Sequence, residues 1–81
     1  MDMSRLKPLV WEELPTGGRT LKFVRTVVLY MEWDVMEFDN GRVVARFPSF
    51  DPPNRIVDSI EHGKALCDLD YRQRVAGLFE G

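Results

Sequence analysis

Two reactive side chains occur once each in the chain, His62 and Cys67. A histidine can deprotonate a cysteine for nucleophilic catalysis when the two side chains are within hydrogen-bonding reach. Here they are five residues apart in a segment with helical periodicity, which places them about 140° apart around a helix. The spacing therefore predicts an exposed helix histidine and a buried thiol, with no catalytic pair.

Other reactive patterns are missing from the sequence. A metal site at His62 would need carboxylates at ligand spacing, and Asp58, Glu61 and Asp68 do not supply it. Residues 17–20 (Gly-Gly-Arg-Thr) lack the Gly-x-x-x-x-Gly-Lys-Ser/Thr pattern of a phosphate-binding loop, and they indicate a turn. We expect a non-enzymatic protein with no catalytic residue, no metal site and no cofactor.

The residues best suited to contact a partner lie in residues 26–41, which carry four acidic side chains and no basic one. In a strand, Glu32 and Asp34 share one face, and Glu37 and Asp39 share the other. These acids either form a solvated surface that discourages edge pairing, or offer an acidic patch to a basic, nucleic-acid-binding surface of another molecule.

Aromatic side chains could anchor such a contact, because tryptophan and tyrosine are enriched in binding hot spots. Trp33, Tyr30 or Trp11 would serve, whichever is exposed, although a core position is the commoner one for a tryptophan. The candidate partner-binding residues are therefore Glu32, Asp34, Glu37, Asp39, Trp33 and Tyr30.

The chain as a whole predicts one small domain. Its 81 residues are assigned to a single domain over residues 1–81, with residues 1–8 as a loose lead-in. The single cysteine excludes an intramolecular disulfide. No apolar run approaches the roughly 18 residues of a membrane span, and the start lacks the apolar stretch of a signal peptide. We expect a cytoplasmic protein, and a core this small leaves a homodimer open.

Strand-forming residues fill the segment from Thr20 to Asp39, which contains neither glycine nor proline. Because strands usually run for about 3–10 residues, we divide it near residues 25–26, into strands 20–24 and 27–38. The residues before it, 9–14, predict a short first strand.

A hairpin is predicted at Asn40-Gly41, where a two-residue type I′ turn would place Phe38 opposite Val43. The partner strand is 42–47. The apolar side changes within the preceding strand, which indicates a bulge between Asp34 and Met36, or a sheet covered on both faces.

A long helix is predicted from about residue 59 to residue 80, after a rigid linker at residues 50–53. Asp58 and Glu61 form a capping-box-like start, and a break near Asp68 is the alternative to one unbroken helix. One stripe of residues recurs at spacings of three and four: Ile60, Gly63, Cys67, Tyr71, Val75 and Leu78.

These elements predict an α+β fold, in which a three- or four-stranded antiparallel sheet is covered by a C-terminal helix. The residues expected to be largely buried are Leu29, Met31, Val35, Phe38, Val43, Phe47, Ile60, Cys67, Tyr71, Val75 and Leu78.

Four short segments carry a resemblance that covers about half the chain: 9–11 (Leu-Val-Trp), 58–61 (Asp-Ser-Ile-Glu), 64–67 (Lys-Ala-Leu-Cys) and 70–74 (Asp-Tyr-Arg-Gln-Arg). With the short antiparallel sheet between them, this pattern resembles the small accessory proteins of bacteriophages and prophages. Some proteins of that kind block host defences, including CRISPR effector complexes, by occupying a surface. The resemblance implies a binding inhibitor and transfers no functional residue.

The expected function is therefore that of a phage-type protein that inhibits a host defence complex, first of all a CRISPR effector, in an infected or lysogenic bacterium. Its expected partner is a host protein or ribonucleoprotein complex. The alternative is a small nucleic-acid-binding or transcription-regulating protein, with Tyr30 available for base stacking. That alternative would use the basic sheet residues Arg19, Lys22, Arg25, Arg42 and Arg46. The net charge of −2 makes it the weaker reading.

Overall fold

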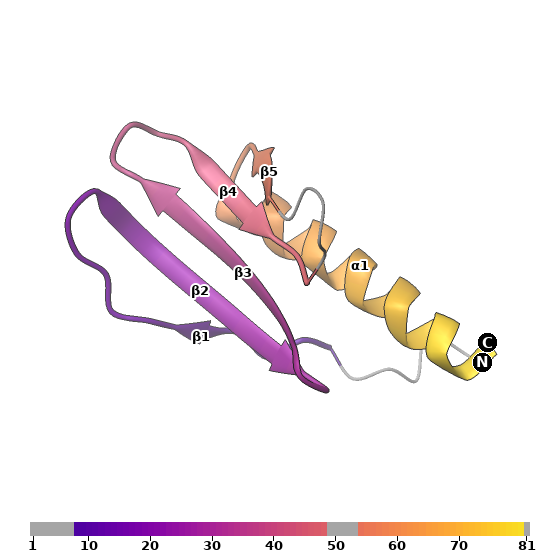
Figure 1. Cartoon of the computed structure of the whole chain (residues 1–81). Coiled ribbons are helices and arrows are strands. Elements are labelled where there is room, and N and C mark those ends of the chain that lie inside the picture. Colours follow the sequence, from indigo (N-terminus) through magenta and orange to yellow (C-terminus); the bar gives the residue numbers. More distant parts are fainter. Residues whose placement is uncertain (1–7, 49–53, 81) are drawn as a thin grey trace.

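A five-stranded antiparallel sheet and one C-terminal helix make up the fold in the computed structural model, which describes residues 8–48 and 54–80, with side chains up to Val75 (Figure 1). The elements are β1 (Glu12–Glu13), β2 (Thr20–Val28), β3 (Met31–Phe38), β4 (Val43–Arg46), β5 (Asn54–Val57) and α1 (Ile60–Glu80). The strands lie side by side in chain order. The predicted α+β fold is confirmed, with five strands rather than three or four.

The longest ladder of the sheet joins β2 and β3. Its register runs from Thr20 opposite Phe38 to Val28 opposite Met31, so the chain reverses at Leu29 and Tyr30. The predicted division near residues 25–26 is wrong, because β2 continues for nine residues through that point. The ladder has one irregularity, between Thr20 and Lys22, and no bulge occurs between Asp34 and Met36.

The β3–β4 hairpin turns through three residues instead of the predicted two. The amide of Gly41 donates to the carbonyl of Phe38 at 3.0 Å, and Gly41 has a φ of 85°. This is a type I turn closed by a left-handed glycine. The extra residue shifts the register by one, so Glu37 lies opposite Val43 and the predicted pairing of Phe38 with Val43 is wrong.

The two edge strands differ from their predictions. β1 comprises only Glu12 and Glu13 of the predicted 9–14 strand. β5 was not predicted, and it pairs with β4 from Val43 opposite Val57 to Arg46 opposite Asn54. The predicted linker at residues 50–53 lies outside the described residues, as do residues 1–7 of the predicted lead-in.

The helix α1 is continuous, so the alternative break near Asp68 is wrong. Its N-cap is Ser59 rather than Asp58: the Ser59 hydroxyl accepts from the His62 amide at 3.0 Å. The His62 side chain accepts in turn from the Asp58 amide at 3.2 Å. A histidine therefore makes the return contact that was expected of Glu61.

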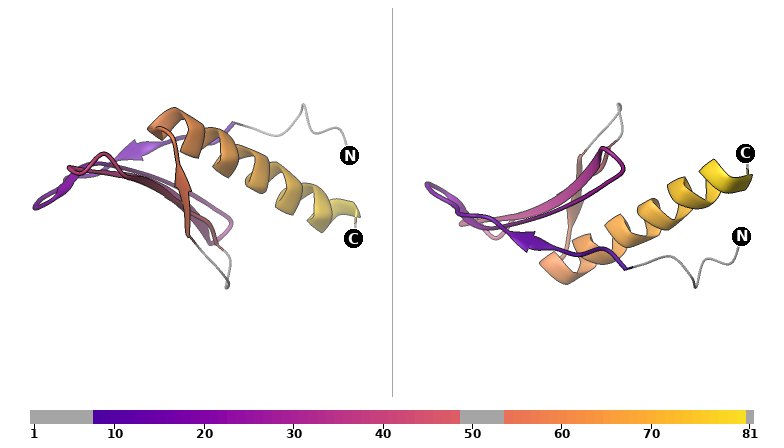
Figure 2. Two further views of the ribbon diagram at one scale, coloured as in Figure 1. Left: turned by 90° about the horizontal axis from the view of Figure 1, so that it is seen from above. Right: turned by 90° about the horizontal axis from the view of Figure 1, so that it is seen from below.

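The helix covers one side of the sheet, over β3, β4 and β5 (Figure 2). Gly63 lets it approach closely, because a Cβ at this position would lie 2.7 Å from a Val35 methyl carbon. The core between the layers consists of Val24, Trp33, Val35, Val43, Ala45, Val57, Cys67, Tyr71 and Val75. The predicted helix stripe is thus confirmed through Val75, and the side chain of Leu78 lies outside the described ones.

Several predicted core residues occupy other environments. Leu29 is 62% exposed, so its predicted burial is wrong. The half-buried ones pack around the core or lie on the far side of the sheet: Met31, Phe38, Phe47 and Ile60.

Candidate partner-binding site

The tip of the β2–β3 hairpin has the most unusual backbone of the described residues. Val28 pairs with Met31, which leaves only Leu29 and Tyr30 to reverse the chain. A two-residue reversal of this hand needs a positive φ at both positions, and the φ values are 51° for Leu29 and 70° for Tyr30. The register of the long ladder therefore holds two bulky residues in the left-handed region.

This conformation costs stability. A non-glycine residue in the left-handed region is disfavoured by about 1–2 kcal/mol, whereas glycine enters it readily. The chain uses glycine for the same purpose at Gly18 and Gly41. At the β2–β3 tip, by contrast, it keeps two large side chains in place.

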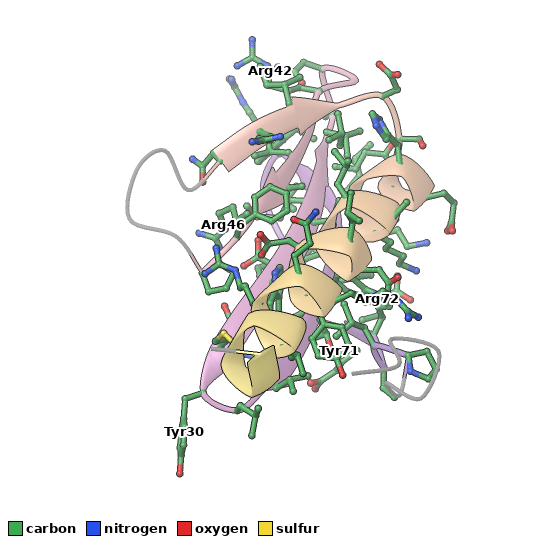
Figure 3. All side chains as sticks on the ribbon, turned by 90° about the vertical axis from the view of Figure 1, so that its right-hand side faces the viewer. Tyr30, Arg42, Arg46, Tyr71 and Arg72 are labelled. Carbon is green, nitrogen blue, oxygen red and sulfur yellow. The ribbon has the colours of Figure 1, made fainter. Side chains whose placement is uncertain are left out.

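Both side chains point into solvent. Tyr30 is fully exposed and Leu29 is 62% exposed, and Figure 3 shows Tyr30 extending away from the rest of the molecule. Val27, one residue before the end of β2, is also exposed. We call Val27, Leu29 and Tyr30 the apolar tip. A tyrosine presents a large contact area with few rotatable bonds, which suits it to anchor a protein contact.

Glu32 and Asp34, the two acids predicted to share a strand face, lie in different environments. Glu32 lies near the apolar tip, opposite Val27, with a carboxylate oxygen 3.9 Å from an Arg25 nitrogen and almost half of its side chain exposed. Asp34 is buried and accepts two hydrogen bonds of 2.7 Å from the Arg46 guanidinium. This pairing raises the pKa of Arg46. The charge of Asp34 is therefore compensated inside the molecule and is not offered to a partner.

The other predicted contact residues do not join Glu32. Asp39 lies in the β3–β4 turn, at the opposite end of β3 from Tyr30 (Figure 1). Glu37 is half-buried and pairs with Val43. The four acids therefore do not form one patch, and of the six predicted residues only Tyr30 and Glu32 lie together on the surface near the apolar tip.

Trp33 belongs to the core. It is completely buried, and its ring meets that of Tyr71 edge-on at 5.8 Å. Its indole nitrogen donates to Asp70 on α1 at 2.7 Å, and Asp70 also accepts from Arg74 at 2.6 Å. Trp33 therefore ties the helix to the sheet and is not a surface anchor. Trp11 is half-buried beneath the ammonium group of Lys64, which leaves Tyr30 as the exposed aromatic residue of the three.

His62 and Cys67 occupy separate environments. Cys67 is completely buried, and burial together with the nearby carboxylates of Asp34 and Asp70 raises the pKa of its thiol to about 12. His62 is partly exposed and engaged at the start of α1. Within residues 8–48 and 54–80, no group of three histidine, cysteine or acidic side chains could hold a metal ion.

Two of the five basic residues of the alternative function are paired with acids. Arg46 is bound to Asp34, and Arg25 lies 3.4 Å from Glu12 and 3.9 Å from Glu32. Such pairing weakens the field that a nucleic acid would meet at Arg25 and Arg46.

The exposure of Leu29 was not predicted, because leucine is usually a core residue and no turn residue marks the reversal. The length of the segment could have revealed it. Dividing residues 20–38 into two strands of equal length puts the reversal at Leu29, and an uninterrupted strand of 12 residues, as implied by 27–38, exceeds the usual length of about 3–10.

Comparison with known proteins identifies no relative. No protein-family model matches the chain, and neither a curated protein nor a solved structure matches it. Among the described residues, α1 has too few apolar side chains to cross a membrane, and no other helix is present.

Proposed function

We propose that this chain is a binding protein that acts by occupying a surface of another protein, with the apolar tip as its contact site. The observation that carries the proposal is the pair of positive φ angles at Leu29 and Tyr30, in side chains that are exposed rather than packed. Backbone strain combined with exposed apolar surface lowers stability and solubility. Its retention is typical of a site maintained for function.

The chemistry of the site indicates the kind of partner surface. Leu29 and Tyr30 would enter an apolar pocket, with the tyrosine hydroxyl reaching its polar rim. Glu32 lies beside them with its carboxylate partly exposed, so a basic rim would be favoured and would speed association. Glu32 is therefore the one acidic residue of the proposed contact, instead of the four expected from the sequence.

A host defence complex of a bacterium is the partner that we propose to test first, and a CRISPR effector within that class. The support for this choice is the resemblance of the sequence to phage accessory proteins, together with a basic rim being common on nucleic-acid-binding surfaces. The protein would act in the cytoplasm of the infected or lysogenic host, and without catalysis, because its buried thiol and its capping histidine are unsuited to it.

The test replaces the strained turn by an ideal one, Leu29→Asn with Tyr30→Gly. This variant should be more stable than the wild type by about 1–2 kcal/mol, because asparagine and glycine accept positive φ. It should also bind the partner at least about 30-fold more weakly, as expected for loss of a hot spot of about 2 kcal/mol. Urea unfolding measures the first effect, and surface plasmon resonance with the purified defence complex measures the second.

The matched control is Leu21→Asn at the other end of β2, where the leucine is 60% exposed. It should leave binding unchanged. Undiminished binding by the tip variant, or equal loss in the control, would show that the apolar tip is not the contact site. Submicromolar binding to DNA or RNA that weakens steeply with salt would replace this proposal with the nucleic-acid alternative.

A further inference from the structure

The first residues of β3 have a neighbouring strand on one side only. β3 pairs with β2 as far as Met31 opposite Val28, whereas β4 pairs only with residues 34–37 of β3. Figure 1 shows β4 ending well before the tip of the β2–β3 hairpin. Residues 31–33 therefore form a strand edge that no other described strand covers. We call this segment the free edge of β3.

The sequence explains why β4 ends at Arg46. The β3–β4 register places Asp34 opposite Arg46, and the same register continued by two residues would place Glu32 opposite Pro48. A proline has no N–H to donate to a neighbouring strand. The ladder therefore ends before Glu32, and Pro48 lies outside β4.

The backbone groups of Glu32 face the free edge. In an antiparallel pair, residues that bond to one neighbouring strand alternate with residues that bond to the other side. Met31 closes the two-residue turn opposite Val28 and so bonds to β2, which leaves Glu32 to bond on the β4 side. The same alternation holds at the other end of β3, where the Phe38 amide donates to the Arg42 carbonyl at 2.9 Å. The amide and the carbonyl of Glu32 therefore point to a position that β4 does not reach.

A cleft of about 380 Å³ adjoins the free edge. It is lined by Glu32 and Asp34 of β3, by Arg46 and Phe47 at the end of β4, and by Asn54 of β5. The end of β4 is therefore bordered by open space on the line that an additional strand would follow beside β3, at the usual spacing of about 4.8 Å.

We propose that an extended segment of the partner protein adds to β3 at the free edge, beside the apolar tip. This inference rests on the proposed function, and it names the form in which the partner binds. Exposed strand edges bind extended peptides through main-chain hydrogen bonds, and neighbouring side chains set the sequence preference. Glu32 supplies one donor and one acceptor, and Tyr30 of the apolar tip lies two residues before it.

The charges around the free edge favour a basic side chain in the added segment. The ionised side chains there are three acids and two bases, which leave one net negative charge: Glu12, Glu32, Asp34, Arg25 and Arg46. The Arg46 guanidinium is bound to Asp34 through two hydrogen bonds, so its charge is compensated. The Glu32 carboxylate makes a looser contact of 3.9 Å with Arg25 and is almost half exposed. A lysine or arginine beside Glu32 would therefore form a cross-strand ion pair.

Amide hydrogen exchange of the full chain, followed by NMR, tests whether the edge is free. Met36 is the matched control, because it lies on the same edge of β3 and pairs with Val44 of β4. The Met36 amide should be protected, and the Glu32 amide should exchange at least about 100-fold faster. Equal protection of the two amides would mean that the edge is already paired, and would overturn the proposal.

The binding test uses two synthetic peptides of alternating threonine and valine, with either lysine or glutamate as the central residue. NMR titration of the wild type should give a Kd below about 1 mM for the lysine peptide, with the largest shifts at residues 31–33. The glutamate peptide should bind at least about fivefold more weakly. Saturation with the lysine peptide should also slow exchange of the Glu32 amide. A lysine peptide that does not bind, or that shifts only other strands, would contradict strand addition.

Glu32→Pro and Glu32→Thr separate the backbone contribution from that of the side chain. Both remove the carboxylate, but only proline removes the N–H, and proline is tolerated on a strand edge whose N–H is not bonded. Glu32→Thr should bind both peptides alike, and Glu32→Pro should bind them at least about tenfold more weakly than Glu32→Thr. Equal binding by the two variants would exclude a main-chain contact. If Glu32→Pro shows no cooperative thermal transition, the exchange rate of the Glu32 amide in the peptide-bound wild type decides instead.

This test is separable from that of the apolar tip. The Leu29→Asn and Tyr30→Gly variant keeps the β2–β3 register, so it should bind the lysine peptide as the wild type does. Binding of the lysine peptide without binding of the defence complex would support strand addition and reject that choice of partner. Tip-dependent binding of the defence complex without binding of the lysine peptide would support the proposed function and overturn strand addition.

Discussion

Cys67 shows how one side chain couples packing to chemistry. It is completely buried between α1 and the sheet, and its environment raises the pKa of the thiol from an ordinary value of 9.0 to about 12. Loss of the proton would place a charge in the core, close to two carboxylates. The thiol therefore stays protonated at neutral pH and behaves as a small apolar group.

This shift predicts a specific loss of stability at alkaline pH. Below pH 9 both the folded and the unfolded state keep the proton. Between pH 9 and pH 12 only the unfolded state loses it, so the free energy of unfolding falls as the pH rises. Relative to Cys67→Ala, which lacks the thiol, the wild type should lose about 1.4 kcal/mol between pH 8 and pH 10. Urea unfolding at both values measures the difference, and parallel behaviour of the two proteins would contradict a raised thiol pKa.

At the scale of single residues, sequence predicts environment poorly where one residue type has two common environments. Trp33 and Trp11 have the same chemistry, yet Trp33 is wholly buried and Trp11 is half-buried. The deciding partner of Trp33 is Asp70, 37 residues away in the chain. The burial of Asp34 likewise depends on its pairing with Arg46 on the neighbouring strand.

Among the elements, α1 is the one whose packing depends on a single missing side chain. A Cβ at Gly63 would lie 2.7 Å and 3.1 Å from the two methyl carbons of Val35, and 3.3 Å from one of Val57. Both valines belong to buried strand positions and have little room to move. The glycine thus fixes the distance between the helix and the sheet.

Gly63→Ala should therefore destabilise the protein by about 1–3 kcal/mol through overpacking, although alanine favours a helix by about 1 kcal/mol over glycine. In a Val35→Ala background the two closest contacts are removed and only the 3.3 Å contact with Val57 remains, so the same substitution should cost much less or become neutral. A double-mutant cycle by urea unfolding measures this coupling. Equal effects of Gly63→Ala in both backgrounds would show that the helix does not rest on Val35.

The hairpins show why element boundaries were harder to predict than element types. The Asn40-Gly41 signal located a turn correctly, but a two-residue and a three-residue loop are both compatible with it. The hydrogen bonds that choose between them come from the pairing of β3 with β4. No turn residue marks the reversal at Leu29 and Tyr30. The pairing of β2 with β3 imposes this reversal on the chain.

In the molecule as a whole, two layers meet through a few specific contacts. The indole of Trp33 joins β3 to Asp70 of α1, and its ring packs against Tyr71. Figure 1 shows the helix starting beside β5 and running diagonally along the sheet, with its C-terminal turns extending away from the strands. The described helix makes its contacts with strands and has no helical neighbour, so its stability should depend on the sheet.

Unfolding should consequently be a single cooperative transition. Helix loss, followed by circular dichroism at 222 nm, should coincide with exposure of Trp33, followed by fluorescence. A Trp11→Phe variant isolates the Trp33 signal. Separate midpoints, with the helix lost first, would show that the two layers are not energetically coupled.

Periodicity and turn chemistry act over a few residues, so the types of most elements could be predicted from the sequence. The stripe from Ile60 to Val75 defined the helix face, and the β-branched segment after Thr20 defined the strands. The separate environments of His62 and Cys67 likewise followed from their spacing. Tertiary structure alone decided the register of the hairpins, the pairing of Asp34 with Arg46, and the exposure of Leu29 and Tyr30. These depend on contacts between residues far apart in the chain, and the energy of such contacts can hold a leucine and a tyrosine in a backbone conformation that neither prefers by itself.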